Sequence, residues 1–89
     1  MSNITHSTIT GIIVDIIPMR RSIRRAYDVM LNARLPDNSI VEVTCGELHQ
    51  EVRHDLCDFP QDFIHKEEVE IKVIQRENGN KTYTAISIL

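Results

Sequence analysis

The choice of fold depends on residues 26–35, which read Ala-Tyr-Asp-Val-Met-Leu-Asn-Ala-Arg-Leu. As a strand, the segment has apolar residues or tyrosine at positions 27, 29, 31, 33 and 35 and mostly polar residues between them. As part of a helix that begins at Met19, it belongs to an apolar series at positions 19, 23, 26, 30 and 33, which is helical spacing. Periodicity therefore leaves two folds open: an all-β chain with one helix, and an α+β chain in the order strand, helix, strand, helix, hairpin.

The flanking segments favour the strand. Residues 18–25, Pro-Met-Arg-Arg-Ser-Ile-Arg-Arg, would place four arginines in the first turns of a helix, where the helix dipole is positive. Residues 35–39, Leu-Pro-Asp-Asn-Ser, are typical of a turn and lead into an alternating segment at residues 40–45. We therefore predict a strand, a tight turn and a second strand.

A β-branched run precedes the arginines. Residues 8–17, Thr-Ile-Thr-Gly-Ile-Ile-Val-Asp-Ile-Ile, predict a strand that Pro18 ends. Gly11 indicates a bulge or a sharp bend, which would allow one strand to serve two sheets. Residues 1–7 are polar, and we expect them to be a flexible N-terminus ahead of a single domain at residues 8–89.

The period changes after the third strand. Apolar residues at positions 48, 52, 56 and 59 predict a helix, and Thr44 with Glu47 matches the capping-box pattern for its start. Pro60 predicts that the helix ends at Phe59, because the residue before proline is disfavoured in the α conformation. Residues 63 and 64 are expected to pack beneath the core, and both phenylalanines are assigned to it.

The last third predicts a β-hairpin. Residues 69–73 alternate, residues 77–80 supply an Asn-Gly turn, and residues 81–89 alternate again. This second strand would place Tyr83, Ala85 and Ser87 on one face. Its other face would hold residues 84, 86 and 88.

The order strand, basic loop, strand, turn, strand, helix, strand, turn, strand resembles the OB-fold, a five-stranded Greek-key barrel. Among small members it is similar to bacterial translation initiation factor one and the cold-shock proteins. The resemblance covers nearly the whole chain through pattern, without a diagnostic motif. It implies that ligands lie across strands 26–35 and 39–44, between the loops at residues 18–25 and 77–81.

Composition limits the class of protein. The chain has 89 residues, a formal net charge of −3 and two cysteines, which indicate one small domain with reduced thiols at Cys45 and Cys57. No apolar run approaches the roughly 18 residues of a membrane helix, and no secretion signal precedes the first strand. We expect a cytoplasmic protein without membrane contact, with an oligomer possible.

The basic residues are concentrated in one loop. Four of the ten Lys and Arg residues lie there, which leaves six against thirteen Asp and Glu in the rest of the chain. Guanidinium groups pair bidentately with phosphates and with carboxylates, so the loop predicts either a single-stranded nucleic acid or RNA, or an acidic protein partner. The alternative is a solvated loop. The candidate contact residues are Arg20, Arg21, Arg24, Arg25, Tyr27, Arg34, Lys81 and Tyr83, the tyrosines serving as platforms for stacking.

Other chemistry finds little support in the sequence. Cys45, His49, His54 and Cys57 are zinc-ligand types, but on one helix the two histidines would point about 140° apart. There is no glycine-rich phosphate loop and no arrangement of nucleophile and base. We therefore expect a non-enzymatic binding protein without catalytic residues, metal or cofactor.

Overall fold

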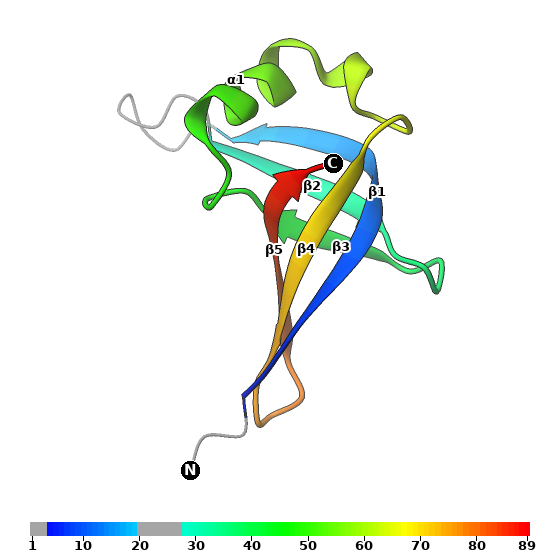
Figure 1. Ribbon diagram of the computed structural model, residues 1–89, viewed down its shortest axis with the longest axis vertical. Coiled ribbons are helices and arrows are strands. Elements are labelled where there is room, and N and C mark those ends of the chain that lie inside the picture. Colours follow the sequence, from blue (N-terminus) through cyan, green and yellow to red (C-terminus); the bar gives the residue numbers. More distant parts are fainter. Residues whose placement is uncertain (1–3, 20–27) are drawn as a thin grey trace.

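The computed structural model describes residues 4–19 and 28–89, which form a closed five-stranded barrel with one α-helix at one end (Figure 1). The elements are β1 (Thr5–Met19), β2 (Asp28–Arg34), β3 (Ile40–Thr44), α1 (Gln50–Asp58), the short 3₁₀ helix η2 (Pro60–Asp62), β4 (Glu68–Gln75) and β5 (Lys81–Ile88). The strands follow the order β1-β2-β3-β5-β4 around the barrel. The predicted all-β chain with one helix is confirmed, and residues 28–34 form a strand.

The long strand β1 belongs to both halves of the barrel. Its first part pairs with β4, from Thr5 opposite Gln75 to Ile12 opposite Glu68, and its second part pairs with β2 from Ile12 onward. The change of partner takes place beside Gly11, as the sequence indicated. β1 begins at Thr5, three residues before the predicted start, because residues 5–7 pair with β4.

Two strands contain an extra residue, so their alternation shifts. In β1 the shift lies between Ile13 and Asp15, after Gly11, and it brings Ile13 and Ile16 to the inside although they are three positions apart. In β5 the shift lies opposite Glu70 and Ile71 of β4. It places the side chain of Ile88 on the same face of the strand as that of Ala85. The predicted strict alternation of residues 81–89 is therefore wrong at its end, because a bulge inserts one residue into the ladder.

The barrel interior is filled by aliphatic side chains from every strand. The buried core consists of Ile13, Ile16, Val29, Leu31, Ala33, Val43, Cys45, Leu48, Leu56, Val69, Ile71, Val73 and Ala85. Phe63 and Ile64 pack against it after η2, as predicted. Phe59 is 51% exposed, so its assignment to the core is wrong: it lies just beyond α1, where the helix has ended.

The helix begins later than predicted. Its N-cap is His49, whose Nδ1 accepts a hydrogen bond from the Glu51 amide, and its last residue is Asp58, just before Phe59 and Pro60. The capping box at Thr44 and Glu47 does not form. The Thr44 hydroxyl contacts β5 and the Glu47 carboxylate pairs with Lys72 at 2.8 Å, so tertiary contacts take both side chains.

The two predicted turns are present. Between β2 and β3, the Leu35 amide donates to the Ser39 carbonyl at 2.8 Å and Asn38 has a φ of 71°. Hydrogen bonds from Ser39 lower the pKa of the Asp37 carboxyl. Between β4 and β5, Gly79 has a φ of 85°, which an Asn-Gly turn accommodates without steric cost.

The two thiols differ in burial and should therefore differ in reactivity. Burial raises the pKa of Cys45 to about 12, and it raises the pKa of the less buried Cys57 by desolvation, with a smaller effect from Asp58. Because the thiolate is the nucleophile, we expect iodoacetamide at pH 8 to alkylate Cys57 well before Cys45 in the folded protein. Peptide mapping of the labelled chain measures this, and equal labelling in urea is the control. Faster labelling of Cys45 in the native state would contradict the packing.

Candidate binding groove

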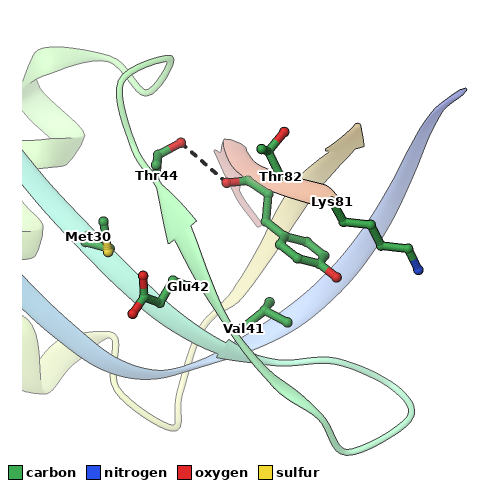
Figure 2. Close-up of a pocket in the computed structure, with 7 residues that line it drawn as sticks. Met30, Val41, Glu42, Thr44, Lys81 and Thr82 are labelled. Atoms are coloured by element: carbon green, nitrogen blue, oxygen red, sulfur yellow. Dashed lines mark hydrogen bonds between the residues drawn. The ribbon is translucent and has the colours of Figure 1, made fainter. Parts of the chain in front are cut away.

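A groove of about 370 Å³ lies where β3 and β5 diverge. Its lining comes from three strands: Met30 of β2, residues 41, 42 and 44 of β3, and residues 81–83 of β5 (Figure 2). In the described part of the chain, Thr44 and Thr84 form the one residue pair between β3 and β5. Beyond that pair the two strands separate, and the groove occupies the opening.

Thr44 closes the head of the groove. Its hydroxyl donates to the carbonyl oxygen of Tyr83 at 3.3 Å (Figure 2). The same oxygen lies 3.4 Å from Oγ1 of Thr84. The sequence favours this contact because both strands carry a threonine at the point of closest approach. In an antiparallel ladder alternate residues direct their amide and carbonyl groups away from the partner. The facing edges of β3 and β5 therefore present backbone groups to the groove.

The groove combines apolar walls with one charge of each sign. Val41 and Tyr83 are half-buried against the core, and Glu42 and Lys81 are exposed. Figure 2 shows Glu42 on the β3 side and the Lys81 chain extending outward on the β5 side. A ligand in this groove would meet apolar surface, an aromatic ring, the Lys81 cation at one edge and the Glu42 carboxylate on the β3 side.

The outer face of β1, β2 and β3 continues the groove as two rows. One row aligns Ile17, Met30 and Thr44 across the three strands, and Ile17 is 39% exposed. The neighbouring row aligns Asp15, Asn32 and Glu42. The row that contains Ile17 and Met30 extends apolar surface from the groove toward β1. The row that contains Asp15 and Glu42 places negative charge beside it.

The predicted contact residues fall into three groups. Lys81 and Tyr83, both in β5, line the groove together. Arg34 is exposed at the far end of β2, four residues from Met30 and so about 13 Å along the strand. The remaining predicted residues lie outside the described part of the chain; they are Arg20, Arg21, Arg24, Arg25 and Tyr27.

Arg34 lines a different hollow of about 530 Å³. That hollow lies beside the change of partner in β1 and is bounded by Thr10, Gly11, Ile12, Arg34, Leu35, Pro36, Asn38 and Glu68. The structure therefore does not bring Arg34 to Lys81 and Tyr83. Sequence reasoning also missed Met30, Val41 and Thr44 as groove residues. Met30 could have been found, since it is an apolar residue on the otherwise polar face of β2.

Residues 4–19 and 28–89 contain neither a candidate metal site nor a helix that could span a membrane. No three His, Cys, Asp or Glu side chains there come together as metal ligands. In the same residues no helix has the length and apolar character needed to cross a membrane.

Comparison of the chain with protein-family models, with curated proteins and with solved structures gave no match.

Proposed function

We propose that this protein is a small OB-type binding protein, without enzymatic activity, that holds a single-stranded nucleic acid in the groove between β3 and β5. The order β1-β2-β3-β5-β4, the parallel contact of β3 with β5 and the helix between β3 and β4 support the OB assignment. The observation that carries the function is the shared groove of Tyr83 and Lys81.

In the proposed complex the groove and the basic loop act on different parts of the strand. A base stacks on Tyr83 and contacts Met30, while Lys81 neutralises a phosphate at the groove edge. The basic residues at positions 20, 21, 24 and 25 join β1 to β2, and β2 enters the groove region two residues after Asp28. We propose that these arginines neutralise further phosphates.

Fluorescence anisotropy with a labelled oligo(dT) of about 20 nucleotides tests this function. Binding should weaken steeply between about 50 and 200 mM NaCl, because phosphate neutralisation releases counterions. Lys81→Ala should lower the slope of log affinity against log salt concentration by about one. Lys66 is exposed and does not line the groove, so Lys66→Ala should leave that slope unchanged. Tyr83→Ala should weaken the binding free energy by about 1–3 kcal/mol and leave the dependence on salt unchanged.

Two outcomes would contradict the proposal. The first is the absence of binding at low salt. The second is equal loss of affinity in the Lys66→Ala control. Circular dichroism of each variant checks that the barrel still folds, which is needed because Tyr83 also packs against the core.

A second function, the docking of an acidic protein partner by the basic loop, is favoured by the strand edges of β3 and β5 that face the groove. A partner's extended segment could add to β3 or β5 through backbone hydrogen bonds, whereas Glu42 and the neighbouring Asp15 row disfavour a phosphate at that place. The arginines would then pair with carboxylates of the partner. In a pull-down, recovery of that partner should survive nuclease treatment and be lost when all four loop arginines are changed to alanine.

A further inference from the structure

The first half of β1 has an open edge that lies opposite the β4 ladder. Residues 5–11 pair with β4 on one side, and pairing with β2 begins only at Ile12. Among the described residues, none pairs with the other side of this segment. The side chains of residues 4–8 and 10 are exposed. Figure 1 shows this part of β1 running beside β4 in an arm that extends away from the barrel.

This edge lacks the charged residues that usually keep sheet edges apart. Residues 2–14 contain no Asp, Glu, Lys or Arg, although 26% of the chain is charged. Native edge strands are commonly protected by lysine, proline or an inward charge, and an exposed β-branched edge without them is open to pairing. The segment Thr-His-Ser-Thr-Ile-Thr at residues 5–10 has none of these protections.

We propose that two copies of this chain associate through this edge, with β1 of one copy antiparallel to β1 of its partner. Two-fold symmetry about an axis perpendicular to the sheet requires that paired residues have the same parity. With Ser7 on the axis, Thr5 is opposite Ile9 and His6 is opposite Thr8. No pair brings like charges together, and two of the pairs contain β-branched residues that favour cross-strand packing.

In the same register, the start of the β1 edge in one copy lies against the end of the β1 edge in the other copy. Ile4, which is 39% exposed, would lie opposite Thr10 of the second copy. Thr10 lines the hollow described above, whose walls include the apolar residues Ile12, Leu35 and Pro36. The isoleucine at the end of one strand thus meets the apolar part of a recess whose other walls include Arg34, Asn38 and Glu68. The symmetry repeats this contact, as expected of an isologous interface.

A second copy is favoured over a charged partner, because an edge without Asp, Glu, Lys or Arg offers no counter-charge to a charged strand, whereas the uncharged, β-branched edge of a second copy matches it. The chain carries a net charge of −3, so two copies repel each other across most of their surfaces. The β1 edge is the part where identical chains can approach without that repulsion. A single strand pair is a small interface, and interfaces of this class give weak, concentration-dependent association.

The arrangement predicts a site-specific crosslink. In a Cys57→Ser background, Ser7→Cys should form a disulfide-linked dimer on mild oxidation, since directly opposed residues in antiparallel strands lie within disulfide reach. Ser39→Cys, exposed in the β2–β3 turn, should give at least tenfold less dimer. Equal crosslinking at both positions, or none at Ser7→Cys, would overturn the proposal.

Sedimentation velocity of the unmodified chain between about 10 µM and 1 mM provides the second test. We expect a monomer–dimer equilibrium that Ser7→Glu shifts to monomer at every concentration, because two carboxylates would face each other on the axis. Ile4→Ser should weaken the dimer about tenfold. A monomer throughout, or a dimer unaffected by Ser7→Glu, would refute pairing through β1. Oligonucleotide binding by dilute monomer is measured separately, so failure of one proposal leaves the other intact.

Discussion

Replacing Leu56 by alanine is expected to lower the free energy of unfolding by about 3 kcal/mol, within the roughly 2–5 kcal/mol range for buried leucines. Leu56 is 0% exposed and is the one fully buried side chain of α1. The helix has nine residues, fewer than the roughly 12–15 that make an isolated helix stable in water. Packing against the barrel therefore holds the helix in place, with Leu56 as its buried side chain and Val52 and Cys57 partly buried against the core.

Urea denaturation followed by circular dichroism measures the effect. Gln50→Ala is the matched control, because Gln50 is exposed on the same helix and its replacement should change the free energy by no more than about 0.5 kcal/mol. Similar losses in the two variants would mean that the helix does not depend on its buried face.

Gly11→Val is expected to destabilise the barrel by about 1–3 kcal/mol through overpacking. A β-carbon at Gly11 would lie 3.1 Å from Cδ1 of Ile71, 3.2 Å from the carbonyl oxygen of Arg34 and 3.3 Å from Cβ of Ala33. The last two atoms belong to paired strands and cannot move independently. The valine methyl groups would enlarge the conflict where β1 changes partner.

The matched control for this variant is Gly46→Val. Gly46 has no heavy atom within 4 Å of an added β-carbon, so the loss of stability there should be much smaller. Thermal unfolding of both variants at one scan rate compares them. If Gly11→Val were as stable as the parent, the close approach of β1 to β2 would be refuted.

Much of the barrel could be predicted from local patterns. Residues 28–34 alternate cleanly because the inward side chains at 29, 31 and 33 are all buried. The Asn-Gly turn and the proline after Phe59 fixed a hairpin and a helix end through backbone geometry. These features depend on neighbouring residues, so one sequence is enough to show them.

The errors came from contacts between distant segments. Thr44 looked like a helix cap, but it bonds to a strand about 40 residues away. The bulges in β1 and β5 insert ordinary β-branched residues, which leave no mark in composition. The groove forms where β3 and β5 diverge, and no local pattern records the distance between them. Lys81 and Tyr83 were predicted as contacts from their charge and their aromatic ring. Val41 and Thr44 were missed because their place in the groove depends on the distance between the two strands.

The partner exchange in β1 also determines when this barrel can form during synthesis. The β4 residues that pair with the first half of β1 lie at least 56 positions later, the separation of Ile12 from Glu68. At about 5–20 residues per second, the ribosome needs roughly 3 to 11 s to supply them. During that interval an uncharged β-branched segment has no native partner on either side. We expect folding to be slow for a chain of this length, because its defining pairings join segments far apart in sequence.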